Sequence, residues 1–158
     1  MKIICIGRNY RKHIEELNNE KPSSPVIFIK PDSSIILKNQ PFFIPDYSNE
    51  IHYEAEVILK ICKLGKSIDK KFANRYYNKI SLGIDFTARD LQNELKTMGL
   101  PWEKSKAFDG SALIGDWIDK NEFKNCNDLN FLLKKNGNDV QFGNTSNMLW
   151  SFDELISE

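Results

Sequence analysis

The sequence contains Tyr53-Glu54-Ala55-Glu56-Val57-Ile58-Leu59-Lys60-Ile61, an apolar run that carries two acids. Its β-branched and aromatic residues predict a β-strand over residues 53–62. Alternate side chains of a strand share one face, so Glu54 and Glu56 are expected to point the same way. A third acid, Asp85, lies in a second apolar run at residues 80–86, which predicts another buried strand.

These acids suggest a metal site. Carboxylates that face one another are costly, because like charges raise each other's pKa and burial opposes ionisation. A divalent cation removes this cost, and oxygen ligands suit Mg²⁺, Mn²⁺ or Ca²⁺ rather than zinc. The alternation alone leaves an alternative open, in which Glu54 and Glu56 lie on the solvent face of an edge strand and pair with lysines.

The composition is that of a globular protein. The chain has 158 residues, of which 41% are hydrophobic and 28% charged, and this predicts one domain with a sizeable core. Lysine plus arginine and aspartate plus glutamate both number 22, which argues against a nucleic-acid or anionic-membrane partner. No apolar run is long enough to span a bilayer. Three scattered cysteines predict reduced thiols and a cytoplasmic protein.

Further elements follow from short periodic patterns. Apolar runs predict strands at residues 2–6, 26–30, 34–37 and 41–44. Helical spacing predicts helices at residues 10–17, 70–77, 87–98 and 151–156, with Thr87 as the cap of the third. Asn136-Gly137 between two apolar runs predicts a β-hairpin. The last helix is short for a stable isolated element, so we expect the natural domain to be longer than this chain.

Eight motifs in a fixed order carry a resemblance to a known family. They are Gly7-Arg8-Asn9-Tyr10, His13-x-x-Glu16, Phe28-Ile29-Lys30-Pro31, Tyr53-Glu54-Ala55-Glu56, Asp85-Phe86-Thr87-Ala88-Arg89-Asp90-Leu91-Gln92, Gly99-Leu100-Pro101-Trp102, Lys106-Ala107-Phe108-Asp109 and Gln141-x-Gly143-Asn144-Thr145-x-x-Met148. This order resembles the fumarylacetoacetate hydrolase family, most closely its small acylpyruvase and oxaloacetate decarboxylase or tautomerase branch.

The resemblance implies a mainly β fold with short helices, an α+β mixed β-roll that often forms homodimers. Residues 1–158 would be a single catalytic domain. The family's Thr-Gly-Thr-Pro-x-Gly-Val segment, which follows the last helix, does not occur here, so the domain is expected to lack its C-terminal part.

The resemblance also implies a set of site residues. Glu54, Glu56 and Asp85 match the metal ligands, for Mg²⁺ or Mn²⁺, with Ca²⁺ possible in crystals. Lys106 matches a lysine that contacts the substrate carboxylate or an enolate, although Lys104 is close in sequence and a solvated surface lysine is the commoner case.

Two residues match a catalytic dyad on a mobile segment. His13 and Glu16 are three residues apart on a predicted helix, hence neighbours on one face. In the dyad Glu16 orients the ring and His13 takes a proton from water. The alternative is an exposed polar helix face.

Other residues are candidates for binding the substrate. Gln92 matches a substrate contact, or it is an exposed helix amide. Arg8 and Lys30 either meet an anionic substrate or serve as structural ion-pair partners. Arg89 is expected to tether the metal loop, and His52 to be a bystander.

The expected protein is a divalent-metal enzyme for small 2-oxo acids, acting by acylpyruvate hydrolysis, which breaks a C–C bond, or by oxaloacetate decarboxylation. Both routes pass through an enolate. Oxaloacetate tautomerisation and isomerisation of unsaturated dicarboxylates in aromatic degradation are alternatives of the same class. A non-catalytic metal- or ligand-binding protein is the alternative of another class.

Overall fold

The computed structural model describes residues 2–16, 20–37 and 39–158, without the side chains of residues 12, 13 and 15. The chain folds into two compact units. The first is formed by Met1–Cys5, Ile27–Glu56 and Leu82–Gly115, and the second by Ile6–Val26, Val57–Ser81 and Asp116–Glu158.

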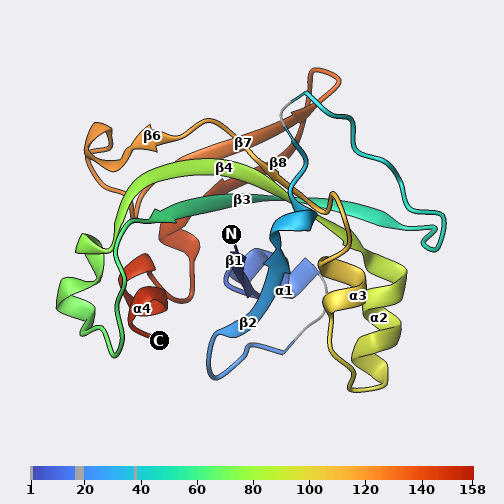
Figure 1. The fold of residues 1–158 in the computed structure, drawn as a ribbon, viewed down its shortest axis with the longest axis horizontal. Helices are drawn as coiled ribbons and strands as arrows, with labels where there is room; N and C mark the ends of the chain where they lie inside the picture. Colours follow the sequence, from blue (N-terminus) through green and yellow to red (C-terminus); the bar gives the residue numbers. More distant parts are fainter. Residues whose placement is uncertain (1, 17–19, 38) are drawn as a thin grey trace. The chain divides into compact units, whose positions relative to one another are not determined.

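Most regular structure in the described residues is β-sheet. The largest sheet has the order β3 (Ile51–Ile61), β4 (Tyr77–Ala88) and β5 (Ala112–Ile114), with β6 (Ile118–Asp119) also paired to β4. Figure 1 shows the two long strands β3 and β4 side by side. β5 runs antiparallel to β4 and places Ala112 opposite Asp85. β1 (Lys2–Gly7) and β2 (Val26–Pro31) form a separate two-stranded sheet.

The interior of the first unit is unusually polar. Its helices α2 (Arg89–Thr97) and α3 (Glu103–Lys106) lie next to each other (Figure 1). Its buried apolar side chains are Phe28, Ala55, Ala88, Leu95 and Ala112. Its buried polar side chains include Lys30, Asp85, Thr87, Arg89, Gln92, Ser105, Lys106 and Ser111. A buried charge is stable only when it is paired, so the charged residues of this set need partners nearby. Their contacts with one another are described below as the candidate site.

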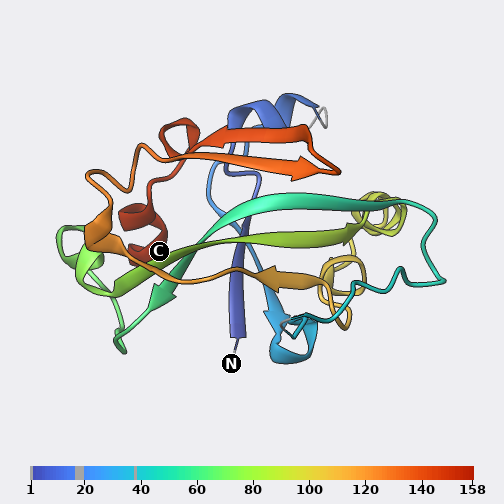
Figure 2. The ribbon, with the colours of Figure 1, turned by 90° about the horizontal axis from the view of Figure 1, so that it is seen from above.

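A hairpin dominates the second unit, where β7 (Asn130–Lys135) pairs with β8 (Asn138–Asn144), as Figure 2 shows. Asn136 and Gly137 both have positive φ, 52° and 83°, as the mirror-image two-residue turn requires. Tyr10, which precedes α1 (Arg11–Glu16), packs its ring edge-on against Phe131 at 6.1 Å. The predicted hairpin is therefore confirmed.

The C-terminal helix α4 (Phe152–Ser157) packs against the 3₁₀ helix η2 (Lys70–Arg75). Ser151 and Glu154 form a reciprocal capping box, which satisfies N–H groups at the start of α4. Phe152 is buried and its ring lies 6.2 Å from that of Tyr77. The aromatic side chain of this short helix is thus buried within the unit, while Leu155 and Ile156 are half-buried.

Several predicted elements differ from the structure. Residues 41–44, all described, form no strand, and Phe43 and Ile44 are 77% and 74% exposed. In place of a strand at 34–37, the 3₁₀ helix η1 (Asp32–Ser34) leads into one bridge from Ile35 to Ala112. The predicted helix at 70–77 is the 3₁₀ helix η2. Short apolar runs do not distinguish strands from irregular segments, which explains these errors.

The helix at 87–98 was predicted correctly, but its cap was not. Helix α2 begins at Arg89 and its N-cap is Ala88, with no side-chain hydrogen bond. Thr87 belongs to β4, and its hydroxyl bonds a buried lysine instead. The end of the first predicted helix, at residue 17, lies outside the described residues.

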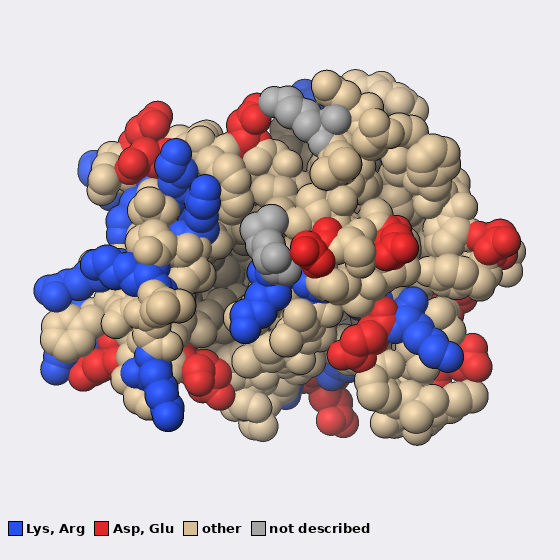
Figure 3. Space-filling view, in the orientation of Figure 1, with Lys and Arg blue, Asp and Glu red and all other residues tan. Residues whose placement is uncertain are grey.

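The surface carries both charges. Figure 3 shows acidic and basic side chains interspersed on the face in view, as equal numbers of the two would give. None of the described helices is both long and apolar enough to cross a membrane. Cys5, Cys62 and Cys126 are free thiols; Cys62 is exposed, and the other two are half-buried.

Acid should weaken the cap of α4. Hydrogen bonds from Lys70 and Ser151 lower the pKa of Glu154 from 4.5 to about 2. A lowered carboxyl pKa stabilises the fold above pH 4.5, and this contribution is lost as the pH falls towards 2. Because the Glu154 side chain is 40% exposed, Glu154→Gln should lower the free energy of unfolding by less than about 1 kcal/mol at neutral pH.

Urea unfolding of both proteins across the acid range checks this. The difference between wild type and Glu154→Gln should shrink below pH 4.5 and vanish near pH 2. Glu122→Gln, at an exposed position, is the control and should show no such trend. A difference that stays constant with pH would contradict the assignment of the shift to this carboxylate.

Candidate active site

Three strands and a short helix bring the predicted acids and lysines together. β2 carries Lys30, β3 carries Glu54 and Glu56, β4 carries Asp85, and Lys106 ends α3. Asp85 and Thr87 are both buried and alternate along β4, so they share one face.

The Lys106 ammonium is the centre of this cluster. Its Nζ donates to Glu54 Oε2 at 2.7 Å, Asp85 Oδ2 at 2.8 Å and Thr87 Oγ1 at 2.6 Å. It also lies 5.4 Å from the centre of the Phe28 ring. Burial lowers the pKa of Lys106, but the charges of Asp85 and Glu54 outweigh burial and raise it, so the ammonium is charged. Lys104 is exposed, and the structure therefore places Lys106 in the site.

Lys30 is a second buried cation. Its side chain is 1% exposed, and Nζ lies 2.8 Å from Asp85 Oδ1. That oxygen accepts no well-aligned hydrogen bond, so the contact is mainly electrostatic. Nζ also donates to the carbonyls of Phe86, Lys106 and Ser111 and to the Ser111 hydroxyl. Burial lowers the pKa of Lys30, and Asp85 opposes this effect.

Arg89 joins the acidic strand to helix α2. Its guanidinium donates to Glu54 Oε1 and to Gln92 Oε1, and its Nε donates to His52 Nδ1 at 3.2 Å. Arg89 and Gln92 are both buried. Arg89 thus links Glu54 to Gln92, and its role as the tether of a metal loop stays a prediction. His52 is partly exposed and also pairs with Glu50 at 2.9 Å.

The carboxyl of Glu56 has a strongly perturbed pKa. Burial raises its pKa well above the usual range, the charges of Glu54 and Asp85 raise it further, and Lys106 lowers it. The three carboxylates therefore lie within electrostatic reach of one another, and each opposes ionisation of the others. Their oxygen chemistry fits a hard divalent cation. Across residues 2–16, 20–37 and 39–158, however, no three acidic, histidine or cysteine side chains are arranged as ligands around one point.

The remaining predicted residues, Arg8, His13 and Glu16, belong to the second unit. His13 and Glu16 lie in α1, and Glu16 is exposed, while the His13 side chain lies outside what the structure describes. Arg8 has a left-handed backbone with φ of 57°. Their roles remain predictions.

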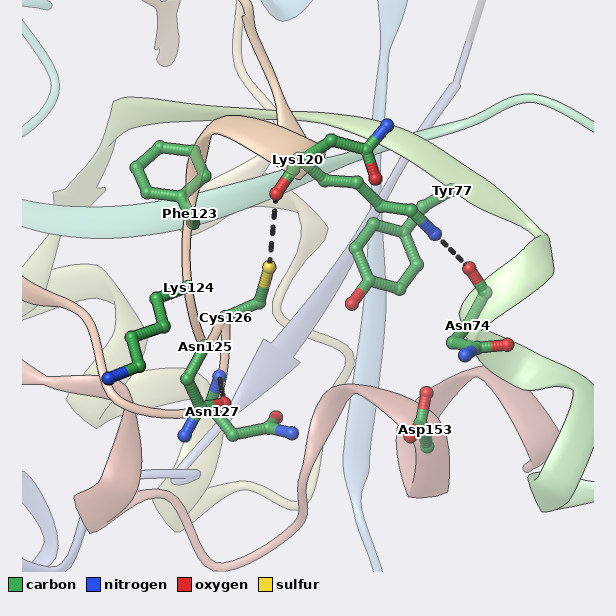
Figure 4. A pocket seen from close by; sticks show the side chains of 10 residues that line it. Asn74, Tyr77, Lys120, Phe123, Lys124, Asn125, Cys126, Asn127 and Asp153 are labelled. Atoms are coloured by element: carbon green, nitrogen blue, oxygen red, sulfur yellow. Dashed lines mark hydrogen bonds between the residues drawn. The ribbon is translucent and has the colours of Figure 1, made fainter.

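A polar recess of about 360 Å³ lies in the second unit (Figure 4). Lys120 stretches over the Tyr77 ring at 4.5 Å and donates to the Asn74 carbonyl, while Cys126 Sγ lies 3.8 Å from the Lys120 carbonyl. Burial, with Cys126 and Asp153 nearby, raises the pKa of Tyr77 to about 12. No predicted site residue lines this recess.

Sequence reasoning missed the residues that support the lysines. Thr87 and Ser111 are both fully buried, and Ser111 Oγ donates to the Lys106 carbonyl at 2.8 Å. Burial raises the pKa of Cys5 to about 12, with a further rise from Asp85. Nothing in the local pattern singles out these small residues, because their partners lie far along the chain.

Comparisons with known proteins identify the family. A family model described as the fumarylacetoacetate (FAA) hydrolase C-terminal domain matches residues 2–158. The chain belongs to the fumarylacetoacetate hydrolase family. The predicted family, the mainly β fold and the enzyme class are confirmed.

Two curated relatives align along nearly the whole chain. Mitochondrial oxaloacetate decarboxylase from Dictyostelium discoideum is 40% identical over 156 residues, which cover 98% of this chain and 72% of that protein. Mitochondrial oxaloacetate tautomerase FAHD1 from Bos taurus is 35% identical over 155 residues, covering 98% of this chain and 70% of that protein.

Solved structures agree with this assignment. A fumarylacetoacetate hydrolase family protein from Yersinia pestis superposes with a TM-score of 0.94 and 36% identity, over 99% of this chain and 72% of that chain. Fumarylpyruvate hydrolase from Pseudomonas aeruginosa, solved with Mn²⁺ and pyruvate, gives 0.92 and 30% identity, over 99% and 70%.

Proposed function

We propose that this chain is a divalent-metal-dependent enzyme that converts a small 2-oxo acid. The observation that carries the proposal is the buried cluster in which Lys106 lies between Glu54 and Asp85, with Glu56 close enough for these two acids to raise its pKa further above the value that burial alone gives. The match of the family model to residues 2–158 supports a single catalytic domain.

Glu54, Glu56 and Asp85 would hold the cation, Mg²⁺ or Mn²⁺. When bound, such an ion stabilises negative charge on the 2-oxo oxygen of the substrate. The raised pKa of Glu56 supports this assignment, because a cation beside this buried carboxyl would stabilise its ionised form. The Mn²⁺ of the related fumarylpyruvate hydrolase is consistent with it.

Lys106 would stabilise the enolate that forms during the reaction. Its ammonium is charged, buried and already fixed in position, as electrostatic stabilisation of a developing anion requires. Gln92 would bind the substrate through its amide N–H groups, because its oxygen already accepts from Arg89. Arg8 would meet a substrate carboxylate. Lys30 would act through Asp85 and Lys106, since protein oxygens surround its ammonium.

Oxaloacetate is the first candidate substrate, because relatives at 40% and 35% identity are named oxaloacetate decarboxylase and tautomerase. In decarboxylation the bond from carbon 3 to its carboxylate breaks and CO₂ leaves. The electron pair remains in the enolate, which then takes a proton to give pyruvate. In tautomerisation a proton leaves carbon 3 and another is added to the oxygen.

Acylpyruvate hydrolysis is the second candidate, favoured by the structural likeness to fumarylpyruvate hydrolase. Here His13, oriented by Glu16, would remove a proton from water, which adds to the distal acyl carbonyl. The C–C bond then breaks to give a carboxylic acid and the pyruvate enolate. Hydrolysis therefore needs the dyad for water attack, whereas decarboxylation does not.

Product analysis separates these reactions. Pyruvate release would be followed from oxaloacetate and from acetylpyruvate with Mg²⁺, with Mn²⁺ and with EDTA, and the oxaloacetate enol by its ultraviolet absorbance. We expect turnover that EDTA abolishes. His13→Ala should remove acetylpyruvate cleavage and retain decarboxylation. Absence of all three activities in the presence of metal would refute the proposed enzyme.

A further inference from the structure

Three oxygen atoms surround the Lys106 ammonium, and one of them belongs to no acid. Glu54 Oε2 and Asp85 Oδ2 accept at 2.7 and 2.8 Å, and Thr87 Oγ1 accepts at 2.6 Å. An ammonium group has three N–H donors, so each donor has one acceptor. Thr87 therefore supplies the one uncharged acceptor among the three that the ammonium bonds.

The Thr87 hydroxyl has a well-defined place. Its side chain is fully buried, and the residue lies near the end of β4, two positions after Asp85. A buried hydroxyl needs a hydrogen-bond partner, and helix α2 does not use it as a cap. A β-branched side chain in a strand has little rotational freedom at χ1, so Oγ1 is a rigid acceptor.

Lys106 is held at its other end as well. Its carbonyl accepts from Lys30 Nζ and, at 2.8 Å, from Ser111 Oγ. A lysine side chain normally retains much rotamer freedom. Here the contacts of the carbonyl fix the backbone and those of the ammonium fix the side chain, so this freedom is removed before any substrate arrives.

We propose that Thr87 is a positioning residue that aims the Lys106 ammonium at the substrate oxygen. The inference rests on the proposed role of Lys106 in stabilising an enolate. If Glu54 and Asp85 held a metal ion, they would share their charge between the ion and the ammonium, and a Lys106 N–H donor that they accept in this structure would become available to the substrate oxygen. The Thr87 hydroxyl then remains as the fixed acceptor that orients Lys106.

Two variants of the full chain test this proposal. Thr87→Val keeps the side-chain shape and removes the acceptor, and Thr87→Ser restores the hydroxyl. We expect Thr87→Val to lower kcat by about ten- to a hundredfold with KM within about threefold, on the scale of lost supporting contacts. Thr87→Ser should recover kcat to within about threefold of wild type.

A second readout needs neither metal nor substrate. Hydrogen exchange of the Lys106 ammonium would be followed by ¹⁵N NMR on the metal-free chain. Exchange should be slow in wild type and Thr87→Ser, and faster in Thr87→Val, because one donor has lost its acceptor. Unchanged exchange in Thr87→Val would overturn the proposal even if the variant were inactive.

Thr145→Val is the matched control. Thr145 is also buried, and its hydroxyl bonds the Cys126 carbonyl at 3.0 Å and the Leu129 N–H at 2.8 Å. It should lose stability without changing kcat or the exchange of Lys106. An equal loss of kcat in Thr145→Val would overturn a specific role for Thr87. A further outcome is that wild type turns over no 2-oxo acid while the Lys106 ammonium of Thr87→Val still exchanges faster. That result would refute both the proposed function and the role of Thr87 in catalysis, and it would support only the hydrogen bond between Thr87 and Lys106.

Discussion

Glu54→Gln is expected to abolish turnover of any 2-oxo acid, with a loss of kcat/KM of at least about a hundredfold. The substitution keeps the side-chain size but removes the negative charge of Glu54. In wild type, Lys106 bonds one oxygen of this carboxylate and Arg89 bonds the other. It also removes one proposed ligand of the cation. Kinetic assays with saturating Mn²⁺ measure the first effect.

Metal binding provides an independent measure of the same change. Mn²⁺ at tens to a hundred times its dissociation constant should raise the unfolding free energy of wild type by about 2–3 kcal/mol, and this rise should be lost in Glu54→Gln. Glu50→Gln is the control, because the Glu50 side chain is 53% exposed and pairs with His52. A fully active Glu54→Gln enzyme would refute both the proposed metal site and the proposed mechanism.

Lys30→Met should be the most destabilising single change in the site, by about 3–5 kcal/mol. It leaves Asp85 Oδ1 without its nearest ammonium and removes a donor from the carbonyls of Lys106 and Ser111. Buried acceptors that lose their donor bear the full cost of desolvation. Urea unfolding of the metal-free chain measures the loss.

Lys104→Met provides the comparison at an exposed lysine of helix α3 and should change stability by less than about 0.5 kcal/mol. If Lys30→Met were as stable as Lys104→Met, the ammonium would not hold this part of the site. A substrate-binding role for Lys30 would then regain support, visible as a raised KM without a loss of stability.

Local pattern was enough to predict much of the fold. The β-branched and aromatic residues of the run at 53–62 predicted β3, and the pair Asn136-Gly137 predicted the turn between β7 and β8. Both signals lie in residues that are neighbours along the chain, so they can be read without knowledge of distant contacts. The absence of a strand at residues 41–44 could not be predicted in this way, because a short strand exists only if a partner strand accepts its hydrogen bonds.

For the site, too, some features could be predicted from the sequence and others could not. Motif order alone predicted the family, the acids and Lys106, because these residues recur at characteristic positions along the chain. Only the tertiary structure showed that Lys106 rather than Lys104 is buried, that Lys30 holds the site together, and that Thr87 bonds an ammonium instead of capping a helix.

The reason lies in the separation of the partners. Lys106 meets Asp85 across 21 positions of sequence, and Lys30 meets Ser111 across 81. A buried ammonium is stable only where several acceptors converge on it, and that convergence depends on how distant strands and helices pack. Spacing along the chain reveals which residues could take part, and packing selects those that do.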